Sequence, residues 1–482
     1  MTKSRKKLFF ENIIIYGLGS VMNMVIPFIM LPIISRLLPG SEYYGVNDTV
    51  TIIVSFGSAI AVMGLYDAIY RFYFDKEDIL YRKKLCSSTF FTVVFTGFIA
   101  SLISIIFQSS LSKLIFSDVS YSPLIIIGGL NIWASSINTI VAAPTRMNNQ
   151  RLRYIIIQTL VPISSYCIAI LLIIRGEYVY ALPLAALISN IVVCFIFLLL
   201  NRHHFDIRKY SVTLLKPLLR FGVPLMPVFI FYWVLSSVGR IVITNTWGLD
   251  YTGIYAAAGK IAAISQLIYS GFAGGWQYFA FSTMKDKDYV ELIARVFDYL
   301  SGISFFATSL LVLLIRPIFA IMLPSSYVDG IVVAPALFLA PLLLMLRQTI
   351  GMHFQVKKWN ILGTFTIGFG ALVAITLYYL LIPSIGISGA AIGSLIGYVA
   401  SLLLTIGILL KRKLLIIYKR VYLGSVLTTV LLSLHMNEVN TLIVNIVAVV
   451  VCIILFSAYY NDIMHLGKGL YRSLFNHKNS DN

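Results

Sequence analysis

Long apolar runs dominate the chain, and short polar connections separate them. A run of roughly 18 or more apolar residues can cross a hydrocarbon core of about 30 Å as a helix. The runs do not alternate strictly between apolar and polar positions, as the strands of a membrane β-barrel would. The pattern therefore predicts an all-α polytopic membrane protein with about 14 transmembrane helices. The segments fall at 9–37, 46–70, 86–108, 122–145, 154–174, 179–200, 222–246, 252–281, 294–315, 331–353, 361–382, 387–410, 421–437 and 441–461.

Composition supports this class. Of the 482 residues, 59% are hydrophobic and only 12% are charged, whereas soluble domains carry about 25% charged residues. A basic N-terminus precedes the first apolar run, as in a signal peptide. The run has no small-residue cleavage site at its end, so we expect a retained first helix.

Basic residues are concentrated in alternate connections. Counting the N-terminus and every second loop collects 30 of the 37 lysines and arginines, and the opposite connections hold four. Cytoplasmic loops carry the excess of basic residues in membrane proteins. We therefore expect both termini in the cytoplasm, and the net charge of +18 does not indicate a nucleic-acid partner.

Two short patterns recur about 205 positions apart. The turn at 42–45 (Glu-Tyr-Tyr-Gly) returns at 250–253 (Asp-Tyr-Thr-Gly), and the basic exit at 149–154 has a counterpart at 355–359. Inherited repetition would mean a six-helix unit used twice in one orientation. The predicted divisions are then 1–200 for helices 1–6, 201–415 for helices 7–12, and 416–482 for helices 13–14 and a cytoplasmic tail. Chance recurrence of short turns is the alternative.

Several cations fall where lipid or an interior cavity is expected. Arg240 lies midway along helix 7, where an insertion cost of about 2.5–3.5 kcal/mol favours a wet cavity or a counter-ion. Arg347 in helix 10 is similar, while Lys260 in helix 8 could instead extend to the interface. The pattern leaves three roles open for Arg240: an anion-binding group, a buried ion pair, or a side chain that reaches an interface. Further substrate-binding candidates at helix ends and mouths are Arg36, Arg71 and Arg146.

Carboxylates are scarce in the same segments. Asp67 lies one helical turn before Arg71, which favours an i,i+4 ion pair, and Asp48 begins helix 2, where it suits the helix dipole. If transport is coupled to protons or sodium, Asp48, Asp67 or His353 could titrate or bind the ion; the membrane potential is another possible source of energy. The candidate interior cations outnumber the carboxylates, so the cavity suits an anionic phosphate or pyrophosphate group.

Signals of enzyme chemistry are missing. The sequence has no glycine-rich phosphate loop followed by Lys-Ser/Thr and no His, Cys or Glu cluster with metal-ligand spacing. No predicted outer loop is large enough for a catalytic domain. The sequence thus predicts a transporter without a catalytic residue, metal or cofactor.

The N-terminal KKLFFENIIIYGLGSVMNMVIPFIMLPIISRLLPGSEYYG and the later LLRFGVPLMP…GLDYTGIY resemble Wzx-type polysaccharide flippases of the multidrug/oligosaccharidyl-lipid/polysaccharide (MOP) superfamily. The resemblance implies two pseudo-symmetric six-helix lobes around a central cavity that opens to alternate sides. It implies an undecaprenyl-pyrophosphate-linked oligosaccharide, turned from the inner to the outer leaflet of the bacterial cell membrane. The products would be capsule, exopolysaccharide or O-antigen, and the implied partners are membrane lipid, a polysaccharide polymerase and chain-length machinery. Family members often carry Asp before the arginine of helix 7, where this chain has Gly239.

Two other functions remain open at this stage. A drug or cation antiporter of the same superfamily should have fewer helices and should line its cavity with carboxylates. A membrane polysaccharide polymerase, ligase or polyprenol-dependent glycosyltransferase should carry a sizeable outer loop with catalytic side chains. The sign of the interior charges and the short loops favour the flippase.

Overall fold

The structure is a computed structural model that describes residues 22, 24–284 and 286–476. Helices, turns and loops account for all of these residues, without a strand among them. In this part of the chain ten helices are long and apolar enough to cross a membrane, and a shorter apolar helix spans Met24–Leu37. The predicted all-α membrane fold is confirmed, and the count of 14 stays a prediction. Part of the predicted segment 9–37 and the end of the tail lie outside the described residues.

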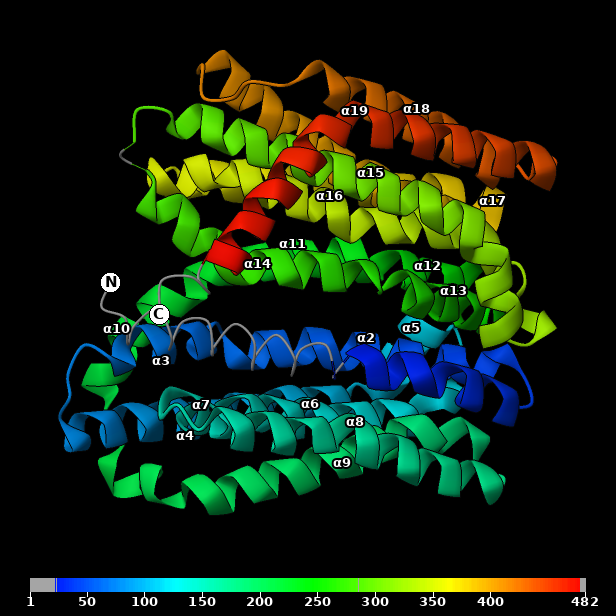
Figure 1. Cartoon of the computed structure of the whole chain (residues 1–482). Coiled ribbons are helices and arrows are strands. Elements are labelled where there is room, and N and C mark those ends of the chain that lie inside the picture. The colour runs from blue at the N-terminus through cyan, green and yellow to red at the C-terminus, as the bar shows by residue number, and fades with distance from the viewer. Residues whose placement is uncertain (1–21, 23, 285, 477–482) are drawn as a thin grey trace.

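Figure 1 shows the helices in two stacked groups with their long axes roughly parallel. We call the lower group, formed by α2 to α9, the first bundle. Its members are α2 (Ser41–Val62), α3 (Leu65–Tyr73), α4 (Ile79–Ile106), α5 (Gln108–Phe116), the single turn η1 (Val119–Tyr121), α6 (Ser122–Val141), α7 (Ala143–Met147), α8 (Arg151–Ile174) and α9 (Tyr178–Asn201).

The second bundle comprises α11 to α17 and lies above the first in Figure 1. Its members are η4 (Val223–Leu225), α11 (Met226–Trp233), the π-helical turn η5 (Val234–Val238), α12 (Gly239–Trp247), α13 (Leu249–Ala262), α14 (Ser265–Ser282), α15 (Tyr289–Met322), η6 (Ser325–Tyr327), α16 (Gly330–Val356) and α17 (Asn360–Lys411). α17 is bent sharply at Ile385 and Gly386, in the gap between the predicted segments 361–382 and 387–410. Gly386 has φ +56° there, a value that glycine adopts without strain.

The connection between the bundles is held against α4. It contains η2 (Arg202–His204), η3 (Ile207–Lys209) and α10 (Val212–Gly222). The Ser87 hydroxyl donates to the carbonyl of His204 at 3.3 Å and accepts from the backbone N–H of Asp206 at 3.0 Å. α10 then packs on α3 and α4, so this connection lies against the first bundle.

Two further helices, α18 (Lys419–Met436) and α19 (Thr441–Asn476), pack on α15. Arg420 binds two carboxylates: its Nε donates to Asp298 Oδ2 at 2.7 Å, and its Nη1 donates to Asp462. The Asp298 side chain has no exposed surface, and Tyr459 also donates to it at 3.0 Å. The C-terminal pair of helices is therefore joined to the second bundle by a buried charge network. The divisions at 1–200, 201–415 and 416–482 stay predictions.

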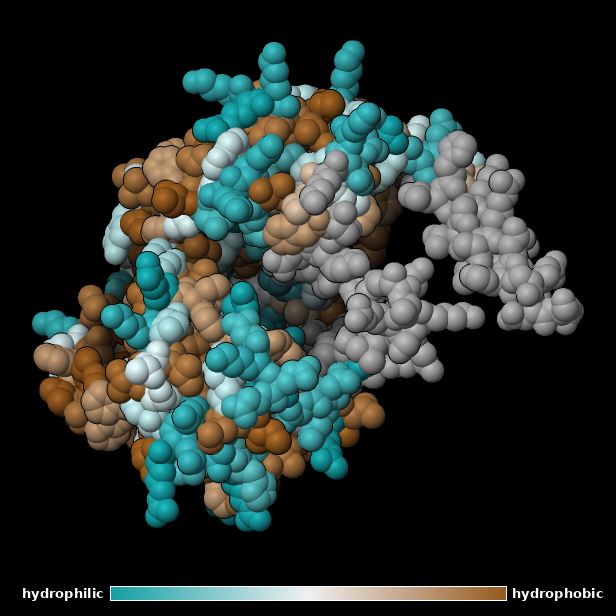
Figure 2. All heavy atoms as spheres, turned by 90° about the vertical axis from the view of Figure 1, so that its left-hand side faces the viewer, coloured by the Kyte–Doolittle hydropathy of each residue, from teal (hydrophilic) through white to brown (hydrophobic). Residues whose placement is uncertain are grey.

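The two ends of the molecule differ in character. One end, which we call the basic face, carries α10 and the connections near α3 and α7 (Figure 1). Seen from that side, hydrophilic side chains gather on the surface, and the surface is hollowed between the two bundles (Figure 2). Because polar and charged side chains avoid the hydrocarbon region, this end is expected to meet water or lipid head groups.

Towards the opposite end the bundles touch at the two recurring sequences, 42–45 and 250–253. We expected turns there, but both sequences lie in the first turns of α2 and α13. A Cβ atom on Gly45 would lie 2.0 Å from the carbonyl oxygen of Leu249, and one on Gly253 would lie 1.9 Å from that of Ser41. Only glycine allows two backbones to approach this closely. The pattern that recurs in the sequence therefore marks the place where α2 and α13 cross.

Candidate functional site

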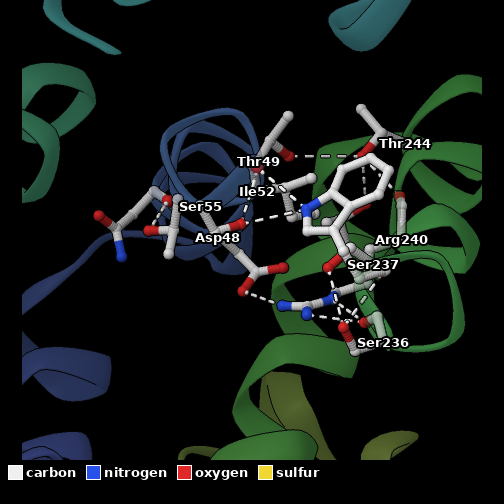
Figure 3. A network of polar contacts seen from close by, with 12 residues as sticks. Asp48, Thr49, Ile52, Ser55, Ser236, Ser237, Arg240 and Thr244 are labelled. Carbon is white, nitrogen blue, oxygen red and sulfur yellow. Dashed lines mark hydrogen bonds and ion pairs between the residues drawn. The ribbon is translucent and has the colours of Figure 1, made fainter. Parts of the chain in front are cut away.

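An ion pair joins the two bundles beside this crossing. Arg240 Nη1 on α12 lies 2.7 Å from Asp48 Oδ1 on α2, and Figure 3 shows the guanidinium reaching from one bundle towards the carboxylate of the other. The Arg240 side chain is 23% exposed and that of Asp48 is 9% exposed. The second carboxylate oxygen, Oδ2, is buried and has no hydrogen-bond partner among the described residues.

Local backbone geometry aims the arginine. The π-helical turn η5 immediately precedes α12, and such bulges are frequent at functional sites. Arg240 Nε and Nη2 both donate to the carbonyl of Ser236 in this turn, at 3.1 and 2.7 Å. Two nitrogens are thereby fixed to the helix, which leaves Nη1 to reach across the interface.

Hydroxyl groups and an indole extend the polar contact between the bundles. Thr49 of α2 lies 3.5 Å from Thr244 of α12, and Thr244 lies 2.8 Å from Thr252 of α13, measured between hydroxyl oxygens. The Trp233 indole N–H lies 3.3 Å from the carbonyl of Ile52 and 3.2 Å from the hydroxyl of Ser55 (Figure 3). We call this set of contacts between α2 and α11–α13 the inter-bundle seam.

The seam changes two expectations from the sequence. We expected Asp48 to begin its helix, but α2 starts at Ser41, so the carboxylate lies in the second turn and serves Arg240 instead of the helix terminus. Of the three roles left open for Arg240, the structure shows an ion pair, and the side chain also keeps some exposure. The residue before Arg240 is Gly239, and the counter-ion comes from the other bundle.

Lys260 lies in the last turn of α13, close enough for the charges of Asp48 and Arg240 to act on its ammonium group. The residue is exposed. It forms no hydrogen bond or ion pair with any described residue. Besides the paired Arg240, the seam therefore has a nearby cation, Lys260, that has no counter-ion among the described residues.

Arg347 on α16 is buried, with 7% of its surface exposed. Its Nη2 donates to the Tyr232 hydroxyl at 2.5 Å and its Nη1 to the Thr366 hydroxyl at 3.4 Å, while Nε has no partner. Both partners are neutral, and no carboxylate of the described chain pairs with it. Next to it, Gln348 accepts from the Tyr269 hydroxyl at 2.9 Å. Burying a cation without a counter-ion is costly, so its presence calls for a functional explanation.

Arg146 on α7 lies among tyrosines of the first bundle. Its Nη1 donates to the Tyr66 hydroxyl at 2.8 Å, and its guanidinium lies over the rings of Tyr70 and Tyr154, 5.4 and 5.8 Å from their centroids. Aromatic rings and a cation can both contact sugars and phosphates. The side chains come from α3, α7 and α8, towards the basic face.

The remaining arginine candidates, Arg71 and Arg36, have partners that suit a structural role. The expected ion pair between Asp67 and Arg71 is wrong. Arg71 Nη1 contacts Asp75 at 2.6 Å instead, because Asp75 lies one helical turn further along the chain. Asp67 is an exposed residue. Arg36 donates to the carbonyls of Ile321 and Met322 at 2.8 and 3.4 Å. It thus caps the C-terminus of α15, where a cation suits the helix dipole.

His353 is buried against the edge of Tyr289, with ring centroids 5.2 Å apart. Its Nε2 has no partner among the described residues. His353 lies near the end of α16, whereas the seam is formed by α2 and α11–α13. The structure therefore does not bring His353 together with Asp48. Within the described chain no group of three or more His, Cys, Asp and Glu residues is arranged to hold a metal ion.

The charges at the site leave a positive surplus. Asp48 faces Arg240 and Asp298 faces Arg420, whereas Lys260 and Arg347 have no carboxylate partner in the described structure. The sequence did not reveal the Asp48–Arg240 pair or the Arg420 network. The sequence signal that could have predicted the pair is the recurrence of the pattern 42–45 at 250–253. These two segments lie where α2 meets α13, close to Asp48 and Arg240.

Comparison with known proteins assigns a family to this arrangement. A family model described as "Polysaccharide biosynthesis protein" matches residues 33–332. The chain belongs to this family. A protein of the Lsg locus of Haemophilus influenzae is 25% identical over 262 residues, which are 53% of this chain and 61% of that protein. The chain thus matches less than two thirds of that relative.

Solved structures show the same fold as this polysaccharide biosynthesis protein. An inward closed conformation of the lipid II flippase MurJ aligns with a TM-score of 0.68 and 15% identity, over 95% of this chain and 99% of that one. An inward-facing multidrug resistance MATE transporter of the MOP superfamily aligns with 0.62 and 17%, over 84% and 95%. A MOP-superfamily transporter from Pyrococcus furiosus aligns with 0.60 and 16%, over 83% and 94%. These likenesses show that the chain has the fold of these membrane transporters.

Proposed function

We propose that this protein is a flippase that moves an undecaprenyl-pyrophosphate-linked oligosaccharide from the inner to the outer leaflet. The observation that carries the proposal is the ion pair between Arg240 and Asp48 across the inter-bundle seam. A cation held by a single carboxylate oxygen, and partly exposed, can exchange that carboxylate for a stronger anionic ligand. Pyrophosphate presents more acceptor oxygens and more negative charge than a carboxylate does.

The exchange connects substrate binding to opening of the seam. While Asp48 holds Arg240, the two bundles are attached near the α2–α13 crossing. When pyrophosphate binds Arg240, this charged contact is lost, which weakens the seam and favours separation of the bundles on the side opposite the basic face. A ligand shifts such an equilibrium only through its different affinity for the two states, and here the difference is the released carboxylate.

The other cations extend the proposed path of the anion. Lys260 offers an unpaired ammonium beside the seam, and Arg347 offers a guanidinium flanked by tyrosine and amide groups that suit sugar hydroxyls. Arg146 with its tyrosines offers a contact nearer the basic face. In this reading Arg71 supports the mouth of the cavity and Arg36 holds helix ends together.

Asp48 is also the proposed coupling group. Its Oδ2 has no partner among the described residues, and its Oδ1 loses its partner when Arg240 binds the substrate. We propose a proton as the coupling ion at this carboxylate. Asp67 and His353 remain weaker candidates because they lie away from Arg240.

We place the protein in the inner membrane of a bacterium with both termini in the cytoplasm, which the concentration of basic residues on one face supports. A polysaccharide polymerase with its chain-length machinery would then receive the flipped unit. The capsule, exopolysaccharide and O-antigen pathways all supply such lipid-linked units.

The test replaces the pair in cells that depend on this chain for surface polysaccharide. Arg240→Ala, expressed at the wild-type level, is expected to abolish surface polysaccharide and to accumulate lipid-linked repeat units. Asp48→Asn keeps Arg240 and removes its charged partner. This variant should bind the lipid-linked unit but should not re-form the contact between the bundles after transport. Both variants are compared by polymer staining and by mass spectrometry of extracted lipids.

Arg175→Gln is the matched control, because Arg175 is an exposed cation away from the seam. It should leave polymer and lipid intermediates at wild-type levels. Normal polymer production by Arg240→Ala would remove the pair from the mechanism. Loss of polymer without any lipid-linked intermediate would contradict the flippase assignment itself.

A further inference from the structure

A charged cavity lies on the second bundle, lined by residues other than those of the inter-bundle seam. Its volume is about 280 Å³, close to the lower limit of about 300 Å³ for small-molecule sites. It lies where the end of α15 and the start of α16 meet the turn between α18 and α19, at the end opposite the basic face (Figure 1). Its polar lining consists of Arg316, Asp329, His435, Glu438, Thr441 and Asn445.

Charges of both signs line this cavity without neutralising one another. Arg316, Asp329 and Glu438 are all exposed, border the same space, and form no ion pair with one another or with any other described residue. His435 is held as part of the wall, with Nε2 3.0 Å from the carbonyl of Ile331. Separated charges around one cavity therefore leave room for a ligand that carries both signs.

The rest of the cavity and its surroundings are apolar. Val312, Val328, Ile331 and Val444 contribute to its wall. Val328 is 54% exposed, and Leu442, which follows the lining residue Thr441, is 68% exposed. A charged pocket bordered by outward-facing apolar side chains suits a molecule with a polar head and hydrocarbon chains.

We propose that this cavity binds the head group of a zwitterionic phospholipid of the phosphoethanolamine type. The phosphate lies at Arg316, and the ammonium lies between Asp329 and Glu438, each making a charge-assisted hydrogen bond. The acyl chains follow the apolar side chains of α15 and α19. The lipid bridges the second bundle and the C-terminal helices, so binding stabilises their docking by mass action. This inference does not rest on the proposed transport substrate.

The test measures the thermal unfolding temperature of the full chain purified in detergent. Palmitoyl-oleoyl phosphatidylethanolamine should raise that temperature, whereas the phosphatidylglycerol with the same chains should not, because it has no ammonium for the two carboxylates. The double variant Arg316→Gln/Glu438→Gln should need about tenfold more phosphatidylethanolamine for half of the effect, since it loses charge-assisted contacts. Soluble phosphoethanolamine forms a third arm, which separates the head group from the intact lipid.

Arg175→Gln serves again as the control, because it removes an exposed cation that does not line the cavity, and it should respond like the wild type. Phosphatidylglycerol acting as strongly as phosphatidylethanolamine would overturn the proposal, as would a wild-type response of the double variant. A full effect of phosphoethanolamine alone at the same concentration would also contradict it, because the ligand would then be a soluble zwitterion. Native mass spectrometry, which should find phosphatidylethanolamine retained by the wild type and lost from the double variant, gives a readout independent of unfolding.

Discussion

At the scale of single residues, the partly or fully buried arginines differ in how their charge is balanced. Arg420 has two carboxylate partners, Arg240 has one from the opposite bundle, and Arg347 has only neutral hydroxyls. A buried cation without a counter-ion costs stability that an apolar residue of similar size would not cost. Arg347 is therefore the residue where function and stability should oppose each other most clearly.

We predict that Arg347→Met leaves the free energy of unfolding unchanged or raises it by up to about 2 kcal/mol, while polysaccharide export falls. The lost guanidinium removes a desolvation cost, and methionine fills the space. Thermal unfolding of the purified chain and surface polymer in cells are the two measurements. Arg420→Met should have the opposite effect. Its free energy of unfolding should fall by about 3 kcal/mol, because Asp298 is left buried without its arginine partner. Strong destabilisation by Arg347→Met would assign Arg347 a structural role.

At the scale of helices, the α2–α13 crossing decides how closely the bundles approach. Gly45 and Gly253 each meet the backbone of the other helix, so any side chain there must push the helices apart. Gly259 lies on α13 as well, but a Cβ atom there would meet nothing within 4 Å. The chain therefore offers a matched pair of glycines on one helix, one at the crossing and one away from it.

We predict that Gly253→Ala shifts the seam towards its open state by about fivefold or more, as expected from an overpacking cost of about 1–3 kcal/mol. The reporter is Thr49→Cys in a chain whose four native cysteines are replaced, labelled in intact cells with a membrane-impermeant maleimide. Labelling should rise in Gly253→Ala and stay at the control level in Gly259→Ala. Equal labelling in the two variants would show that the crossing does not control access to the seam.

At the scale of the whole molecule, transport by alternating access requires the two bundles to separate at the seam. The Thr49 and Thr244 hydroxyl oxygens lie 3.5 Å apart across it, which places cysteines at these positions within reach of a disulfide. A covalent bond there would hold the bundles in the present arrangement, whatever ligand is bound.

We predict that oxidised Thr49→Cys/Thr244→Cys loses export by about tenfold or more and that a reducing agent restores it, since breaking a disulfide thermally is far slower than domain motion. Export is followed by the appearance of polymer at the surface after the reductant is added. Thr244→Cys/Thr252→Cys is the control: its hydroxyl oxygens lie 2.8 Å apart within the second bundle, so its disulfide should not block transport. Normal export by the oxidised cross-bundle pair would exclude opening of the seam from the mechanism.

The sequence by itself determined the class of the molecule. Runs of apolar residues long enough to cross a bilayer require helices, because lipid offers no partner to backbone polar groups. The same local reasoning located the interior cations Arg240 and Arg347. These properties depend on residues that are neighbours in the chain, so no tertiary information was needed.

Only the tertiary structure decided how the charges are paired. Asp48 and Arg240 are 192 residues apart and meet because α2 and α13 cross at Gly45 and Gly253. The expected pair of Asp67 and Arg71 failed because Asp75 competes for the same arginine. Helix spacing restricts which residues can face one another on one helix, but the partner of a charge in a bundle is set by how helices cross. For that reason the sequence could point to Arg240 but could not supply its carboxylate.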